Sequence, residues 1–442
     1  MVAYDKTSPE SILEFASRLT ERSLAELVDF PDDVMNKKNK GDLGSLLETF
    51  YFEHRPATNS GPDFEEAGVE LKATGVVPHK VLKYKAKERL VLTMINFEEI
   101  VSEQWETSTL VKKCRLMLIM FYLYQKQVEV IDRRFVIDPL LYRMYERDLA
   151  QIRTDWEAIR AKVIDGKAHE LSEGDTVYLG AARKGSGGPN EPLRKQPNSH
   201  VGAKARAFAF KPPYVDALIA GEKVLPAVLD ISEEVSFEEA VRRRFSAYEG
   251  KTVPEIAASF GLSKTSKSQK GFHRQLAVKI LAAGGSSIPE LDRAGIELKT
   301  IRLGINGKPR ESMSFPGFKF LEIVNEDWEE SSFFEKIEKK FLFVVFSPKD
   351  YVDEIFQTAF LWNMPYNDRL EAQRVWEDTR RRVAIDATDL PGMTESPVAH
   401  VRPKGKNGND TIPTPQGGMH LRQAFWLNSS YIHSVVQLQS EN

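Results

Sequence analysis

The sequence predicts a two-domain α/β protein, and three observations lead to this prediction. The chain has 442 residues, which is long for one hydrophobic core and suits two domains of roughly 200 residues each. Segments with the apolar period of a helix alternate with strand-like apolar runs along the chain. The second half also repeats the motifs of the first half in the same order, which indicates a divergent tandem duplication.

The first helical segments precede residue 51. Residues 9–30 are expected to form a helix pair, in which Ser23 and Glu26 occupy the positions of a capping box. An amphipathic helix is expected next, because four apolar residues fall on one stripe: Leu43, Leu46, Leu47 and Phe50. Glu48 lies just beside this stripe, so its side chain can point along the helix toward the strand that follows.

That strand carries the strongest candidate for chemistry. Asp63 ends a turn, and a strand begins with Glu70, Leu71 and Lys72. The period of two then sends Glu70 and Lys72 to one face of the sheet. Acid oxygens that hold a hard divalent cation against a phosphodiester, beside a lysine that orients or deprotonates water, are typical of a metal-dependent nuclease. Alternating charges on the solvated face of a strand are the alternative interpretation.

The remainder of the first half contains a strand over residues 89–96 and a helix over residues 149–163. Between them, Trp105 to Ser108 lead into a helix or strand that carries Lys113. A glycine-rich loop is expected over residues 180–188; it lacks the spacing of a P-loop, but its Arg183 and Lys184 could reach into a DNA groove. Residues 221–236, rich in Glu and containing Pro226, suit a connection between domains.

The second half then repeats the first. Ala67-Gly68-Val69-Glu70-Leu71-Lys72 returns as Ala294-Gly295-Ile296-Glu297-Leu298-Lys299, and Trp105-Glu106 returns as Trp328-Glu329. The copies differ where the first copy carries its acids. Aligning them places Val278 opposite Glu48 and Glu290 opposite Asp63. Because a site with one acid missing and another altered should hold a metal ion poorly, we predict that only the first copy cuts.

Composition excludes several classes of protein. Cys114 is the only cysteine, which excludes an internal disulfide framework and a cysteine-based zinc site; a core thiol is expected there. No stretch approaches the ~20 apolar residues of a membrane span, and the N-terminus carries no export signal, so we expect a cytoplasmic protein. The net charge is −3, so DNA would have to meet local positive stretches such as residues 80–89 and 402–406.

Together the motifs resemble those of the MutH mismatch-repair endonucleases and of the MutH-related GATC restriction endonucleases of the Sau type, which consist of two MutH-like halves. The resemblance covers nearly the whole chain. It rests on seven segments, residues 40–48, 63–72, 105–113, 178–185, 297–301, 307–309 and 401–404. It implies a restriction-endonuclease-like fold with a central mixed sheet flanked by helices. It also implies a catalytic domain over residues 1–225, a linker over 226–236 and an inactive DNA-binding domain over 237–442.

The resemblance also implies roles for individual residues of the first copy. Asp63 and Glu70 would ligate Mg²⁺ with a contribution from Glu48. Lys72 would position the attacking water, and Lys113 would neutralise the phosphate or the developing charge.

A DNA-reading loop of this family carries Arg-Pro-Lys. The second copy keeps this motif as Arg402-Pro403-Lys404, whereas the first copy has Ala182-Arg183-Lys184. Arg402, Lys404, Arg183 and Lys184 are therefore the candidate DNA-binding residues, and of the first-copy residues only Lys184 transfers cleanly from the family motif.

The leading hypothesis is thus a Mg²⁺-dependent type II restriction endonuclease that cuts both strands of duplex DNA at GATC, with the second copy as a DNA-binding allosteric effector. One active copy requires either dimerisation on the DNA or two successive nicks. A MutH-type repair endonuclease that nicks hemimethylated GATC is the first alternative, although such enzymes have one domain. A non-catalytic DNA-binding protein is the second, although clustered carboxylates without a metal ion repel phosphates.

Overall fold

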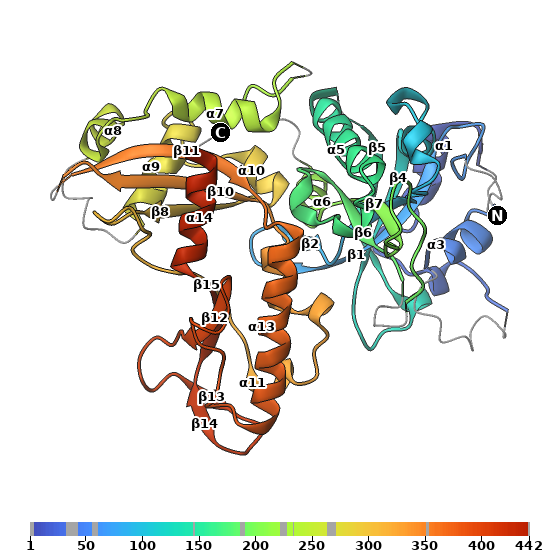
Figure 1. Cartoon of the computed structure of the whole chain (residues 1–442). Coiled ribbons are helices and arrows are strands. Elements are labelled where there is room, and N and C mark those ends of the chain that lie inside the picture. Colours follow the sequence, from blue (N-terminus) through green and yellow to red (C-terminus); the bar gives the residue numbers. More distant parts are fainter. Residues whose placement is uncertain are drawn as a thin grey trace.

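The structure is a computed structural model that describes residues 4–31, 43–54, 61–144, 146–185, 191–221, 228–232, 234–262, 271–350 and 353–440. The Lys40-Gly41 motif, the end of the glycine-rich loop and part of the expected linker lie outside these ranges. Figure 1 shows the two halves side by side, the first in blue to green and the second in yellow-green to red.

The first half builds two sheets. The larger sheet has the strand order β2-β1-β4-β5, in which β1 and β4 run parallel and the other neighbours antiparallel. The smaller sheet has the order β3-β7-β6 and is antiparallel. The strands are β1 (Glu70–His79), β2 (Lys83–Ala86), β3 (Leu90–Met94), β4 (Leu116–Leu123), β5 (Phe135–Arg143), β6 (Leu179–Arg183) and β7 (Arg206–Phe210).

The second half repeats this arrangement. Its strands β8 and β10 run parallel and β11 pairs antiparallel with β10, while β9, β15 and β12 form an antiparallel sheet. The strands are β8 (Glu297–Arg302), β9 (Met313–Gly317), β10 (Phe341–Pro348), β11 (Glu354–Trp362), β12 (Ala399–Pro403), β13 (Thr411–Pro413), β14 (Met419–Leu421) and β15 (Gln423–Leu427). The matching strand order of the two halves confirms the predicted mixed-sheet fold and agrees with the repeat of motifs in the sequence.

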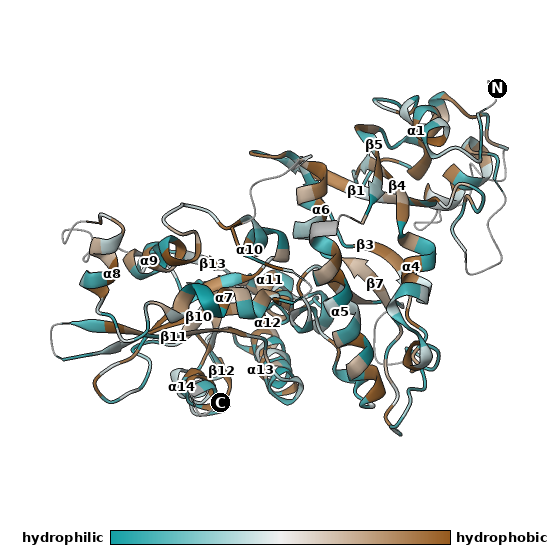
Figure 2. Cartoon of the chain, turned by 90° about the horizontal axis from the view of Figure 1, so that it is seen from above, coloured by the Kyte–Doolittle hydropathy of each residue, from teal (hydrophilic) through white to brown (hydrophobic). Residues whose placement is uncertain are grey.

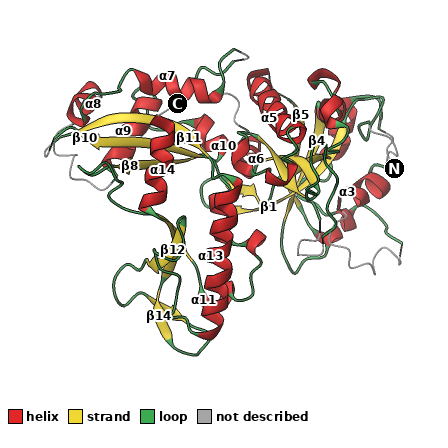
Figure 3. Ribbon diagram, viewed as in Figure 1, coloured by secondary structure: helices red, strands yellow, loops and turns green. Residues whose placement is uncertain are grey.

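Helices surround the strands of both halves (Figure 3). They are α1 (Pro9–Ser17), α3 (Leu43–Leu46), α4 (Thr109–Cys114), α5 (Glu146–Ile164), α6 (Pro212–Ile219), α7 (Phe237–Ser246), α8 (Val253–Ser259), α9 (Phe272–Leu281), α10 (Pro289–Ala294), α11 (Phe320–Ile323), α12 (Ser332–Ile337), α13 (Tyr366–Ile385) and α14 (Ser429–Ser440). In Figure 2 the helices α7 and α13 are largely hydrophilic, whereas strands such as β3 and β7 are brown. None of the described helices is long and apolar enough to cross a membrane.

Two central strands are buried on both faces, which accounts for their continuous apolar runs. In β4, Met117, Ile119 and Phe121 face the central core, and the alternate residues face the core beneath α1. In β10, Leu342, Val344 and Phe346 face the same central core, and the alternate residues face a third core under α13. The central core is therefore continuous across both halves, while strand pairing within the described ranges stays inside each half.

Two local expectations were wrong. The 180–188 segment is not a loop throughout, because β6 extends to Arg183 and pairs with β7. Ser23 makes no side-chain cap, and only a short 3₁₀ turn (Leu24–Glu26) follows it. The capping box forms instead at the equivalent place in the second half, where Thr252 and Glu255 cap α8.

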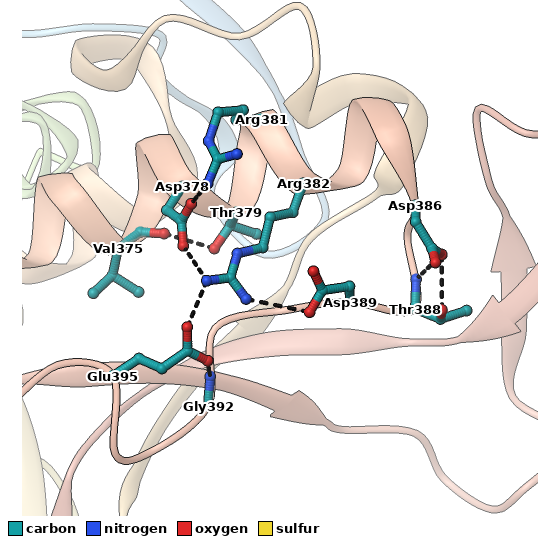
Figure 4. A network of polar contacts seen from close by, with 10 residues as sticks. All are labelled: Val375, Asp378, Thr379, Arg381, Arg382, Asp386, Thr388, Asp389, Gly392 and Glu395. Atoms are coloured by element: carbon teal, nitrogen blue, oxygen red, sulfur yellow. Dashed lines mark hydrogen bonds and ion pairs between the residues drawn. The ribbon is translucent and has the colours of Figure 1, made fainter.

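A cluster of charges fixes the approach to β12. Arg382, in the last turn of α13, contacts three carboxylates: Asp378 at 2.8 Å, Asp389 at 3.3 Å and Glu395 at 2.5 Å (Figure 4). Asp389 and Glu395 belong to the segment between α13 and β12. This segment is therefore tied to the helix just before the strand that carries Arg402.

Candidate active site

The predicted acid pair forms at the start of β1. A tight loop returns on itself between Phe64 and Val69, whose backbones exchange two hydrogen bonds of 2.9 and 3.1 Å. Gly68 closes this loop with a φ of +66°, a conformation that favours glycine. Asp63 and Glu70 consequently lie together: the Asp63 backbone N–H donates to Glu70 Oε2 at 3.2 Å, and Asp63 Oδ2 accepts from the Leu71 N–H at 2.8 Å.

Glu48 approaches this pair from a helix. α3 continues as a π-helical turn over Leu47–Tyr51, and such turns often occur at functional sites. Partial burial, together with repulsion from Asp63 and Glu70, raises the pKa of Glu48 to about 7, although Lys72 and Lys113 oppose the rise. The structure therefore gathers all three predicted carboxylates into one electrostatic neighbourhood.

Two lysines meet the same carboxylate. Lys72 Nζ lies 2.5 Å from Glu70 Oε1, and Lys113 Nζ lies 3.4 Å from that oxygen. Lys72 is two residues along β1 from Glu70, as the strand period predicted, while Leu71 is buried. Burial alone would lower the pKa of Lys72, but the Glu70 carboxylate outweighs it and the pKa is raised. Lys72 is therefore a protonated partner of Glu70 in this structure.

The helix α4 positions Lys113. Ser108 caps the helix: its hydroxyl oxygen accepts from the Val111 N–H at 3.2 Å, and its hydroxyl donates to the Trp105 carbonyl at 2.8 Å. Cys114, which follows Lys113, is fully buried, and this confirms the expected core thiol. The site thus combines residues from the π-helical turn after α3, the loop before β1, β1 itself and α4.

The chemistry of these side chains suits a hard divalent cation. The donors are carboxylate oxygens, the ligands that Mg²⁺ accepts. Burial and the charge of Asp63 raise the pKa of Glu70 despite both lysines, so a bound cation would relieve the crowding of negative charge. Across the described ranges, no three His, Cys, Asp or Glu side chains lie close enough to hold a metal ion. The three carboxylates are therefore neighbours here without the spacing of a coordination shell.

The second half does not assemble the same acids. Residues Pro289–Ala294 form the helix α10 where the first half has its tight loop. Glu290 is buried and accepts from the Val228 and Leu229 N–H groups at 2.7 and 3.1 Å. Val278, opposite Glu48 in the alignment, packs against the central core. Glu290 is thus a structural residue that secures the segment between the halves.

The predicted DNA-binding residues of the first half lie at the end of β6. Arg183 forms an ion pair with Glu329 of the second half, and its guanidinium lies 4.7 Å from the centre of the Phe334 ring. Lys204 also contacts Glu329, at 2.5 Å. Lys184 lines a cavity of about 490 Å³ that reaches Ala73 on β1. The contact of Arg183 and Lys184 with DNA stays a prediction.

Their counterparts in the second half lie on an exposed edge. Arg402 stacks over the Trp426 ring, with 3.9 Å from the guanidinium carbon to the ring centre. Lys404 Nζ donates to the Phe315 carbonyl at 2.6 Å. The Lys184 and Lys404 backbone N–H groups make equivalent 2.8 Å hydrogen bonds, to Ala205 and Arg422. The alignment of the two loops therefore agrees with the structure.

Sequence reasoning missed Lys336. Its Nζ lies 3.4 Å from Glu297, the distance that separates Lys113 from Glu70. Ser331 caps α12 as Ser108 caps α4, so Lys336 occupies the place of Lys113. The alignment of Trp328 on Trp105 contained this information, because the same offset leads from Lys113 to Lys336. Arg133, which lines the 490 Å³ cavity, has no such marker in the sequence.

Comparison with known proteins also divides the chain into two halves. The MutH family model, described as DNA mismatch repair enzyme MutH, matches residues 52–155 and residues 281–374. The chain is 27% identical over 224 residues to the DNA mismatch repair protein MutH of Shewanella woodyi, covering 48% of this chain and 93% of that protein. It is 26% identical over 182 residues to the MutH protein of Vibrio cholerae, covering 39% and 78%.

A longer match spans both halves. The chain is 30% identical over 462 residues to the type II restriction enzyme Sau3AI of Staphylococcus aureus, and the match covers 91% of this chain and 93% of that enzyme. The resemblance inferred from the motifs is thereby confirmed. Because this similarity spans nearly both whole chains and the MutH match occurs twice, the protein belongs to the MutH-related type II restriction enzymes of the Sau3AI kind and is a restriction endonuclease that acts on DNA.

Proposed function

We propose that the protein hydrolyses phosphodiester bonds in both strands of duplex DNA at GATC sites and that this reaction depends on Mg²⁺. One observation carries the proposal: the first half gathers Glu48, Asp63, Glu70, Lys72 and Lys113 at the start of β1, with both lysines within 3.4 Å of Glu70. The GATC sequence comes from the resemblance of the motifs.

The acidic residues of the site and its lysines have different roles. Asp63, Glu70 and Glu48 would hold Mg²⁺. When bound, the ion would act as a Lewis acid on the phosphoryl oxygen and lower the pKa of a bound water. Lys72 orients the attacking water, and Lys113 places positive charge beside the phosphate, where negative charge develops. The Leu71 N–H holds one oxygen of Asp63 and so keeps this carboxylate at the site.

We assign the second half, from residue 237 after a linker over 226–236, the role of a DNA-binding allosteric effector that does not cut. Two differences from the first half support this assignment: the helix α10 replaces the tight loop, and Glu290 Oε1 is held by the Val228 and Leu229 N–H groups. Arg402 and Lys404 would contact DNA in this half, and Arg183 and Lys184 in the first. Cutting both strands with one active half then requires two molecules on the DNA or two successive nicks.

Incubation of an unmethylated plasmid with several GATC sites, with Mg²⁺ or with EDTA, followed by end sequencing, tests the proposal. We expect linear fragments that end at GATC only with Mg²⁺. Asp63→Asn should reduce cutting at least about a hundredfold while DNA binding persists, because the lost group stabilises the transition state more than the bound substrate. Asp165→Asn is the matched control, since that carboxylate is exposed and distant in sequence from the site.

The products separate the alternatives. Nicked circles without linear fragments would favour a MutH-type repair reaction at hemimethylated GATC. Intact plasmid whose migration is retarded by the protein would mean that the chain only binds DNA. If Asp63→Asn still cut both strands at the wild-type rate, the active site would have to lie elsewhere.

A further inference from the structure

The second half keeps part of this site. Its lysines outnumber its carboxylates there, whereas the carboxylates outnumber the lysines in the first half. Glu297 occupies the place of Glu70, and its two carboxylate oxygens contact Lys299 at 3.1 Å and Lys336 at 3.4 Å. These lysines occupy the places of Lys72 and Lys113. The acids that accompany Glu70 are not matched here: Val278 stands in the aligned position of Glu48, and Glu290, in that of Asp63, lies on α10 and is bonded through Oε1 to the backbone of Val228 and Leu229.

The charge of this group is positive. Lys299 and Lys336 both contact the carboxylate of Glu297. Lys339 also acts on Glu297, but its own partner is Glu335 at 3.4 Å. Lys404 Nζ donates to the Phe315 carbonyl, so it does not belong to the group. Two lysines thus face a single carboxylate, which leaves an excess of positive charge.

The two clusters also differ in exposure. The side chains of Glu297 and Lys299 are 31% and 30% exposed, whereas those of Glu70 and Lys72 are 2% and 17% exposed. A double helix is a rigid polyanion, so it reaches an open cluster more easily than a recessed one. The first cluster has three carboxylates and two lysines, and it therefore needs a cation before a phosphate can approach.

We propose that Glu297, Lys299 and Lys336 form a phosphodiester-binding site that holds the DNA backbone without a divalent metal ion. This inference rests on the proposed function, because it takes duplex DNA as the ligand of the second half. Glu297 holds Lys299 and Lys336 in place, and the two ammonium groups neutralise the phosphate. The protein thus binds DNA in two modes: a metal-dependent mode in the first half and a metal-independent mode in the second.

Fluorescence anisotropy with a short labelled duplex, containing GATC or a scrambled site, tests the inference on the full-length protein in EDTA. Lys299→Met/Lys336→Met should weaken binding in EDTA at least about tenfold and flatten the dependence of log affinity on log salt by about two, one for each lost phosphate contact. Both duplexes should be affected equally, because phosphate contacts carry no sequence information.

Lys319→Met/Lys349→Met is the matched control, since both lysines are exposed on the second half outside this cluster; its affinity should stay within about twofold of wild type. Glu297→Gln supplies a second arm. If the site works without metal, removing the carboxylate should raise the affinity in EDTA. A loss of affinity confined to Ca²⁺-containing buffer would instead make Glu297 a metal ligand and overturn the inference.

Thermal melting of each variant excludes misfolding as the cause. Wild-type affinity of the Lys299→Met/Lys336→Met variant in EDTA would also overturn the inference, because the metal-free contact would then lie elsewhere. The proposed function is judged separately by plasmid cleavage in Mg²⁺. If the wild-type protein did not cut the GATC plasmid but the lysine variant still lost binding in EDTA, the proposed Mg²⁺-dependent cleavage at GATC would be wrong and the phosphate site would stand.

Discussion

At the scale of single residues, two lysines of the site share one carboxylate oxygen. Lys72 and Lys113 both contact Glu70 Oε1, at 2.5 and 3.4 Å, and Glu70 is almost fully buried. Lys72 is fixed by its position on β1, two residues from its partner. Lys113 comes from a separate helix and is the longer contact, so it is the lysine with more freedom to turn toward a phosphate.

Lys113→Met tests this difference. The variant keeps most of the side-chain volume but loses the charge, so kcat for cleavage should fall about a hundredfold or more while KM changes little, because the lost charge acts on the transition state. Lys112→Met is the matched control, since Lys112 is the neighbouring exposed lysine of the same helix. Equal losses in both variants would show that general charge around α4, and not Lys113 itself, supports cleavage.

At the scale of elements, one short helix decides where Lys113 lies. α4 has six residues, so it has little intrinsic stability and depends on its N-cap and its packing. Ser108 is fully buried and bonds to both the Val111 N–H and the Trp105 carbonyl. This serine therefore connects the Trp-Glu motif to Lys113, which gives that motif a physical role.

Ser108→Ala should lower the free energy of unfolding by about 1 kcal/mol, the usual cost of losing an N-cap, and should also reduce kcat severalfold because Lys113 shifts. Urea unfolding and steady-state cleavage measure the two effects. Thr252→Ala removes the cap of α8 in the second half and should lower stability by a similar amount with unchanged kcat. A Ser108→Ala enzyme with full kcat would show that the cap does not position Lys113.

At the scale of the whole molecule, the two halves are closely packed. A Cβ atom added at Gly174 would lie 2.5 Å from the Asn363 Cβ, and the Asn363 amide donates to Asp175 at 3.1 Å. A cavity of about 660 Å³ lies between the halves, lined among others by Arg183, Lys204 and Glu329. The end of β6 that carries Arg183 is therefore held against the second half.

Glu329→Gln should release Arg183 and Lys204 from their shared carboxylate. We expect severalfold tighter binding of a duplex in EDTA and a salt dependence steeper by one to two, because both cations become available to phosphates. Glu330→Gln, at the exposed neighbouring position, should change neither quantity. Anisotropy titrations at several salt concentrations measure both, and an affinity equal to wild type would mean that these cations do not meet DNA.

Local sequence patterns determined much of this protein. The period of two placed Glu70 and Lys72 on one face of β1, because side chains alternate in any strand. The repeat of motifs predicted the repeat of sheets, since the same order of segments folds in the same order of strands.

Tertiary structure decided the contacts that join distant segments. Glu290 aligns with Asp63, yet α10 replaces the tight loop, so its carboxylate reaches the backbone after residue 227 and not Glu297. Arg183 pairs with Glu329, 146 residues away in the chain. No period or spacing encodes such contacts, because they depend on how complete elements pack. The sequence by itself therefore determined which residues could carry the chemistry, and packing decided which of them meet.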